Sequence, residues 1–316
     1  MPTLLSLEAL EADRHYVQRQ LNEIQPNPWG TAKLMWESRL ADIDREIAAL
    51  AASRSNYASV ALIFDGLPVI GESNIRLDFA TDALDEYQRL VTLALASRHS
   101  EESSQRGPIS DADRSRLFIR DLARGSVGFI LEEIPPKQKV MFPTELKNAV
   151  EESTLLLATL SSATDEIFES TLETTPPKLV AAVQRFAKIL YESGASTRIV
   201  GDQHRLVLSA DDVGHLSRRL NEVEVSEMVE PTDGILLGIL PESRQFELKR
   251  SGDDAETIKG AISKELAFKY TADVAFKERL LLRPVRAQIT FVRTTRNGKI
   301  VRERRVLESV EASTDV

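Results

Sequence analysis

The chain has 316 residues, a formal charge of -9, 42% hydrophobic residues, 28% charged residues and no cysteine. This apolar share is ordinary for globular proteins and excludes a globally disordered chain. Without cysteine, disulfides, thiol nucleophiles, iron–sulfur clusters and cysteine-ligated zinc are excluded. The acidic balance argues against strong non-specific binding of nucleic acid by the chain as a whole.

The sequence is not expected to contain a membrane span or an export signal. Apolar runs such as Ile235 to Leu240 are far shorter than the about 20 residues of a membrane-spanning helix. The segment from Met1 to Glu8 lacks a basic group and a long apolar stretch, so a signal peptide is not expected. A cysteine-free chain fits a reducing compartment, and we expect a cytoplasmic protein with no membrane partner.

Residues 1–57 are expected to form an antiparallel coiled-coil hairpin. Apolar residues recur at heptad spacing in the first half, at Leu7, Leu10, Val17, Leu21 and Ile24. Pro26 and Pro28 cannot lie inside a helix, so they mark the turn. Spacings of 4, 3, 4 and 3 predict a seam in the second half, made of Trp36, Leu40, Ile43, Ile47 and Leu50. Because two short helices are marginal alone, the seam should close on the body or on another chain.

Residues 58–230 are expected to form a mixed α/β central domain. Ser59–Phe64 is predicted to be a buried strand, followed by a helix from about Phe79 to Ala96. Arg116–Arg120 and Val127–Leu131 are predicted to form a β-hairpin in which Ile119 faces the core. Further helices are predicted within 144–195 and at 211–220, and further strands at 75–77, 198–200, 205–208 and 222–228.

Residues 231–316 are expected to form a small β-barrel of the SH3-like or OB-like type. Short strands are predicted at 234–240, 245–248, 257–262, 285–292 and 300–307. Asn297-Gly298, between the last two, is a strong signal for a two-residue hairpin turn. The predicted fold class is therefore α+β, with a helical hairpin, a mixed α/β body and a C-terminal barrel.

Two acidic groups are candidates for chemistry. Asp78 and Asp82 would share one helix face with Asp85, and Asp65 ends the preceding strand. Such carboxylates could hold Mg²⁺ or Mn²⁺, which supports the hypothesis of a carboxylate-metal-dependent enzyme. The competing interpretation is that Asp78 caps the helix and the others face water.

The second acidic group is Asp202, which lies near His204 and with it resembles a general-base pair, although a hairpin turn explains this aspartate equally well. No nucleotide-binding, dinucleotide-binding or zinc-protease motif is present. The sequence therefore assigns no catalytic residue, no metal ligand and no cofactor.

The C-terminal region carries the strongest concentration of positive charge. A nucleic-acid site is predicted there from Arg293, Arg296, Lys299, Arg302, Arg304 and Arg305. On a barrel edge these side chains would contact phosphates. Two other interpretations stay open, namely a solvated edge strand and a basic face that docks onto the protein's own acidic middle.

We expect a non-enzymatic interaction or scaffold subunit of a cytoplasmic multi-component complex. The expected partner is a second copy or another protein, bound by the N-terminal hairpin through Trp36, Leu40, Ile43 and Ile47. The alternatives are nucleic-acid binding by the basic barrel and metal-dependent catalysis at the acidic cluster. These hypotheses name different residues, so the structure can show which residue sets come together.

Overall fold

The computed structural model describes residues 1–23, 31–52, 55–71, 73–99, 114–123, 127–135, 140–162, 164–252 and 256–313. The chain divides into two compact units. Unit 1 contains Met1–Leu95, Asp111–Ser162 and Arg185–Ser217, and unit 2 contains Ala96–Ser110, Ala163–Gln184 and Arg218–Val316. The domain boundaries expected after residues 57 and 230 stay predictions. No helix in the described ranges is both long and apolar enough to span a bilayer.

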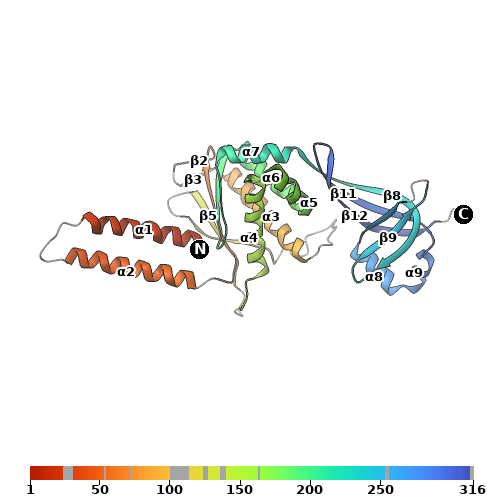
Figure 1. Cartoon of the computed structure of the whole chain (residues 1–316), viewed down its shortest axis with the longest axis horizontal. Helices are drawn as coiled ribbons and strands as arrows, with labels where there is room; N and C mark the ends of the chain where they lie inside the picture. Colours follow the sequence, from red (N-terminus) through yellow and green to blue (C-terminus); the bar gives the residue numbers. More distant parts are fainter. Residues whose placement is uncertain are drawn as a thin grey trace. The chain divides into compact units, whose positions relative to one another are not determined.

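Unit 1 begins with the expected helical hairpin (Figure 1). Its helices are α1 (Thr3–Glu23) and α2 (Thr31–Ala52), which pack against each other along their lengths. At about 1.5 Å per residue, each helix is about 30 Å long. The predicted turn residues Pro26 and Pro28, and the seam residue Ile24, lie outside the described residues.

The sheet of unit 1 is antiparallel throughout, with strand order β4-β5-β1-β6-β7. Its strands are β1 (Ser59–Gly66), β4 (Phe118–Leu122), β5 (Val127–Glu132), β6 (Ala195–Val200) and β7 (Arg205–Leu208). The predicted strand at 59–64 and both predicted β-hairpins are confirmed. β1 takes the central position because its first six residues, apolar except Ser59, are buried on both faces.

Different elements cover the two faces of this sheet. Helices α3 (Leu77–His99), α4 (Glu145–Ser162), α6 (Pro177–Glu192) and α7 (Ala210–Asn221) belong wholly or in part to unit 1. Phe79 of α3 packs edge-on against Phe64 of β1, with ring centroids 5.2 Å apart. Leu4 and Leu5 of α1 pack on the opposite face, against Ala61 and its neighbours. The hairpin is therefore continuous with a layer that covers the sheet.

One strand prediction in this unit is wrong. The segment at 75–77 was expected to be extended, but α3 begins at Leu77, and only Asn74–Ile75 (β3) pairs, with Val69–Ile70 (β2). The reason is local, because Asp78 lies in the first turn of α3, where a carboxylate favours the helix N-terminus.

Unit 2 contains α5 (Asp165–Thr174) and a closed five-stranded barrel with strand order β10-β12-β11-β8-β9. The strands are β8 (Val223–Leu240), β9 (Gln245–Arg250), β10 (Thr257–Ile262), β11 (Pro284–Arg296) and β12 (Lys299–Ala312). All neighbours pair antiparallel except β10 and β12, which close the barrel in parallel. Asn297 and Gly298 both have positive φ, as the predicted two-residue turn requires.

Two features of the barrel differ from expectation. The strands predicted at 222–228 and 234–240 are one strand, β8, because it pairs with β11 without a break from Val223 to Ile235. Helices α8 (Lys264–Ala272) and α9 (Val274–Leu280) lie between β10 and β11 and were not predicted. Ser263 and Asp273 cap them, and both helices bury apolar residues in the barrel core.

Candidate interaction sites

The seam of the helical hairpin closes within the chain. Ile43 is completely buried, and Trp36, Leu40 and Ile47 are half-buried. The Tyr16 and Trp36 rings meet edge-on, with centroids 6.1 Å apart. The residues predicted to bind a partner therefore first hold the two helices together.

Ion pairs between the helices flank this seam. Arg14 Nε donates to Asp44 Oδ1 at 2.7 Å on one side, and Arg39 pairs with Asp13 at 3.7 Å on the other. Pairs this exposed contribute little to stability, typically about 0–1 kcal/mol. They do favour this alignment of the two helices, because oppositely charged side chains face each other on both sides of the seam.

The part of the hairpin distant from the sheet exposes apolar side chains. Leu34, Met35 and Tyr16 are 66%, 60% and 53% exposed. We did not single out these three residues from the sequence. Leu34 and Met35 lie outside the 4-3 spacing of the seam, and an apolar residue outside the seam is expected to be exposed. This position in the sequence was the available signal.

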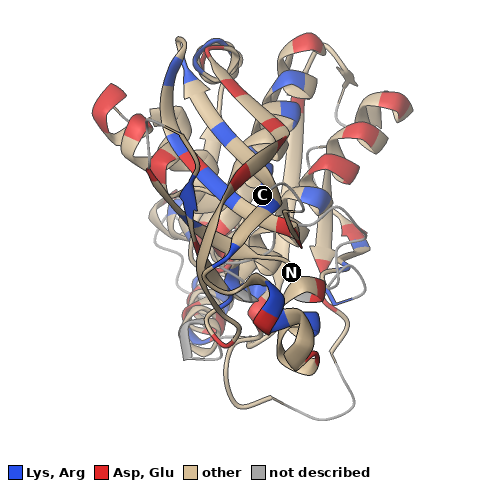
Figure 2. Ribbon diagram, turned by 90° about the vertical axis from the view of Figure 1, so that its right-hand side faces the viewer, with Lys and Arg blue, Asp and Glu red and all other residues tan. Residues whose placement is uncertain are grey.

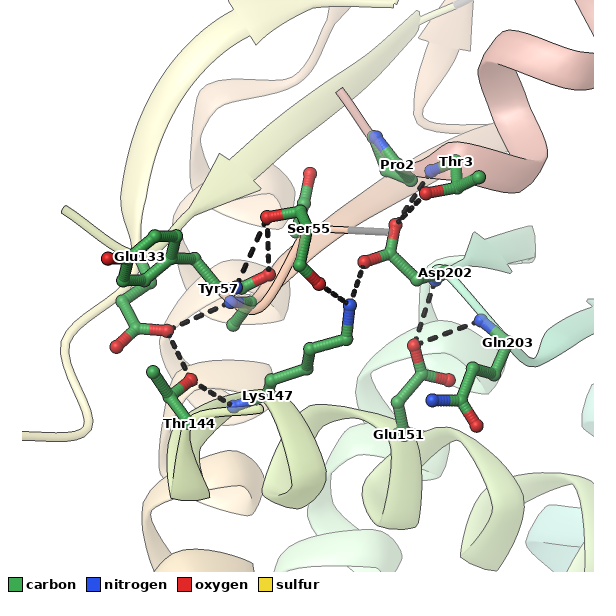
Figure 3. A network of polar contacts seen from close by, with 12 residues as sticks. Pro2, Thr3, Ser55, Tyr57, Glu133, Thr144, Lys147, Glu151, Asp202 and Gln203 are labelled. Atoms are coloured by element: carbon green, nitrogen blue, oxygen red, sulfur yellow. Dashed lines mark hydrogen bonds and ion pairs between the residues drawn. The ribbon is translucent and has the colours of Figure 1, made fainter. Parts of the chain in front are cut away.

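A buried polar network fixes the base of the hairpin (Figure 3). Lys147 of α4 donates an ammonium hydrogen bond to Asp202 Oδ2 and another to the Ser55 carbonyl. Thr3, at the start of α1, donates from its backbone N at 2.7 Å and its Oγ1 at 2.9 Å to Asp202 Oδ1. The Asp202 carboxylate therefore joins α1 to α4, and the Lys147 ammonium links both to the chain that follows α2.

Glu151 holds the β6–β7 turn beside this network. Its carboxylate accepts backbone hydrogen bonds from Asp202, Gln203 and His204 at 2.8, 3.1 and 3.0 Å. Asp202 and His204, considered above as a general-base pair, thus take part in a structural turn. The signal for this role was the position of Asp202 in a predicted hairpin.

Salt bridges also tie α1 to the sheet. Glu8 accepts from Arg198 at 3.0 Å and from Arg205 at 2.9 Å. Burial raises the pKa of the Glu132 carboxyl, but hydrogen bonds from the terminal ammonium and from Arg120 outweigh it and lower that pKa overall. These contacts make the start of α1 part of the body.

The acidic residues considered for metal binding are not brought together. Arg76 and the backbone N–H of Phe79 donate to Asp78, and these hydrogen bonds lower its pKa to about 2. Asp65 accepts from its neighbour Gly66, while Asp82 faces solvent. In the part of the chain that the structure describes, no three Asp, Glu or His side chains are grouped to hold a metal.

Several of the predicted nucleic-acid residues have partners within unit 2, among them Arg293, Arg296, Arg302 and Arg305. Arg296 is the clearest case, since its guanidinium pairs at 3.1 Å with Asp165, Glu169 and Glu222. It also lies over the Phe168 ring, 5.0 Å from the centroid. The Arg296 side chain is only 10% exposed, because α5 and Glu222, the residue before β8, surround it.

The remaining basic residues of the set follow the strands of unit 2, where Figure 2 shows blue and red segments interspersed. Arg293 and Arg305 both pair with Glu303, and Arg302 donates to the Glu173 carbonyl at 3.1 Å. Lys299 is exposed beside the turn, and Arg304 is half-buried. This geometry favours the interpretation that basic strands neutralise the protein's own acidic residues.

Comparisons with known proteins add no family. No family model, curated protein or solved structure matches this chain.

Proposed function

We propose that this protein is an interaction or scaffold subunit of a multi-component cytoplasmic complex, and that the α1–α2 hairpin binds the partner. The observation that carries this proposal is the contrast between the two ends of the hairpin. Its base is fastened by the Lys147–Asp202 network, whereas Tyr16, Leu34 and Met35 expose large apolar surface farther out. An anchored arm loses little conformational freedom on binding, so more of the contact energy appears as affinity.

The composition of the exposed surface suits protein recognition. Trp and Tyr are enriched among the residues that dominate binding energy at interfaces, and Trp36 and Tyr16 form one aromatic pair here. We interpret the 4-3 seam as a short antiparallel coiled coil, in which Leu40, Ile43 and Ile47 support this pair. Partner binding at Trp36 would use the part of its ring that the hairpin leaves exposed.

The test compares variants that leave the seam intact. Leu34→Ser with Met35→Ser should remove binding while α1 and α2 stay folded, because both side chains are exposed. The matched control is Leu67→Ser, which alters another exposed leucine of unit 1. Native mass spectrometry of the full chain isolated from its host should show a complex with another protein for the wild type and the control only. A complex with another protein that survives the double substitution contradicts the proposal.

One observation favours a second candidate, an oligonucleotide-binding barrel. From β8 to β12 the strands lie in the spatial order first, second, third, fifth, fourth, with the third and fifth parallel and helices between the third and fourth. This arrangement corresponds to the OB-like type, whose second and third strands commonly bind oligonucleotides. A hollow of about 630 Å³ lies over these strands and includes Arg244 and Lys259.

Fluorescence anisotropy with a labelled single-stranded oligonucleotide tests this candidate. Affinity should fall with rising salt, and Lys259→Glu should weaken it. Lys277→Glu is the matched control, because Lys277 is exposed on α9 and does not line the hollow. Absence of binding at low salt, or equal effects of both substitutions, would remove the candidate.

A further inference from the structure

The two edge strands of the unit 1 sheet are covered very differently. Leu206 and Leu208 of β7 lie on the side of the sheet that α3 covers, and they are 6% and 2% exposed. Ile119 and Leu122 of β4 lie on the same side of the sheet, yet they are 59% and 61% exposed. The apolar layer therefore continues to β4 without being covered there, contrary to the expectation that Ile119 is a core residue.

A β-bulge produces this arrangement. Ile119 pairs with Leu131 and Leu122 pairs with Phe129, and the register shifts between them. Regular alternation would place residues three positions apart on opposite faces, but the extra residue Arg120 brings both onto one face.

The two charged residues of the bulge lie on the other face. Asp121 pairs with Ile130 of β5, and Arg120 reaches Glu132 of the same strand. Along β4, the side chains from Ile119 to Leu122 thus follow the order apolar, basic, acidic, apolar, with the two apolar members on one face and the charges on the other.

We propose that β4 pairs antiparallel with β4 of a second copy of this chain, about a twofold axis between Arg120 and Asp121. In this register Ile119 lies opposite the second copy's Leu122, and Arg120 lies opposite the second copy's Asp121. Apolar side chains then meet on the α3 side of the sheet, and opposite charges meet on the α1 side. A twofold contact requires such self-complementarity, because both copies contribute the same residues to it.

The same features select against unrelated partners. A short strand, a bulge and charged residues are devices that protect sheet edges from indiscriminate pairing. β4 has all three, so an incoming strand must match both its irregular face pattern and its charge order. The chain's own β4 meets both conditions, and two five-stranded sheets would join into one continuous sheet.

Dilution series in light scattering and native mass spectrometry of the full chain test the pairing. The wild type should give a dimer of the 35.2 kDa chain. Ile119→Lys with Leu122→Lys should raise the dimer dissociation constant about tenfold or more. Val207→Lys, on the exposed side of edge strand β7, is the matched control and should leave it unchanged. A far-UV circular dichroism spectrum that matches the wild type verifies the folding of each variant.

A charge exchange makes the test specific to the register. Asp121→Arg and Arg120→Asp should each weaken self-association, since each places like charges opposite each other. An equimolar mixture of the two variants should form heterodimers, because opposite charges face each other again. Heterodimers that do not form would overturn the register.

Two outcomes overturn the proposal as a whole. The first is a wild type that stays monomeric at every concentration, which leaves hairpin binding to another protein untouched. The second is a dimer that resists the β4 substitutions but is lost with Leu34→Ser and Met35→Ser. That second result assigns self-association to the hairpin instead.

Discussion

Lys147 and Asp202 form an ion pair in which the two side chains are only 4% and 5% exposed. The pair joins α4 to the β6–β7 turn, and Thr3 and Ser55 complete it from the two ends of the hairpin. A charge left alone in such a place is costly, whereas a buried pair replaced by apolar groups often costs little.

Replacing only one member of this pair should therefore destabilise the protein strongly. Lys147→Met is expected to lower the free energy of unfolding by about 3–5 kcal/mol, measured by urea denaturation. The double variant Lys147→Met with Asp202→Leu should recover much of this loss. As a control, Lys188→Met affects an exposed pair with Glu192 and should change stability by less than about 1 kcal/mol. A double variant no more stable than the single one would refute the pairwise account.

The hairpin should open independently of the sheet when its seam is weakened. Ile43→Ala removes a completely buried side chain and should cost about 2–5 kcal/mol locally. Hydrogen exchange should quicken in α1 and α2 while the amides of β1 stay protected. Leu34→Ala, at an exposed position of the same helix, should leave exchange unchanged. Equal loss of protection in β1 would show that the hairpin and sheet unfold together.

Two barrel glycines should differ in how strongly alanine destabilises the protein. A Cβ at Gly260 would lie 2.4 Å from the Arg305 carbonyl oxygen, so the β10–β12 contact must shift. Gly260→Ala should destabilise by about 1–3 kcal/mol in thermal unfolding. A Cβ at Gly238 meets nothing within 4 Å, and Gly238→Ala should change stability by less than about 0.5 kcal/mol. Similar losses of stability for both variants would contradict the close packing of Gly260 against β12.

Acid should weaken unit 2 through Glu303. Burial raises the pKa of this carboxyl, but hydrogen bonds from Arg293 and Arg305 outweigh it and lower the pKa overall. A carboxyl whose pKa is lower in the folded state than in the unfolded state stabilises the protein at pH values above its unfolded-state pKa. This stabilisation is lost as the pH falls through its folded-state pKa. The free energy of unfolding should thus decline below about pH 4, and Glu303→Gln should flatten the decline. Glu242→Gln, in the exposed β8–β9 turn, is the control and should leave the wild-type pH profile unchanged.

Local patterns in the sequence sufficed for many elements. The 4-3 spacing of Trp36, Leu40, Ile43 and Ile47 predicted α2, and Asn297-Gly298 predicted the turn between β11 and β12. These patterns are reliable because the helix and the turn that they predict form through interactions between residues only a few positions apart. Helices α8 and α9 escaped prediction because they have only 9 and 7 residues, too few for an apolar period to stand out.

The candidate sites depended far more on the tertiary structure. The sequence placed Arg296 in a basic run, but its partners Glu169 and Asp165 lie 127 and 131 positions away. Likewise, nothing in the β4 sequence shows that Ile119 stays exposed, because that depends on where the covering helices end. The sequence by itself determined which segments are helical or extended, through contacts within each segment. Which charges are neutralised and which apolar residues stay exposed were decided only when distant segments packed together, because pairing and burial depend on neighbours in space.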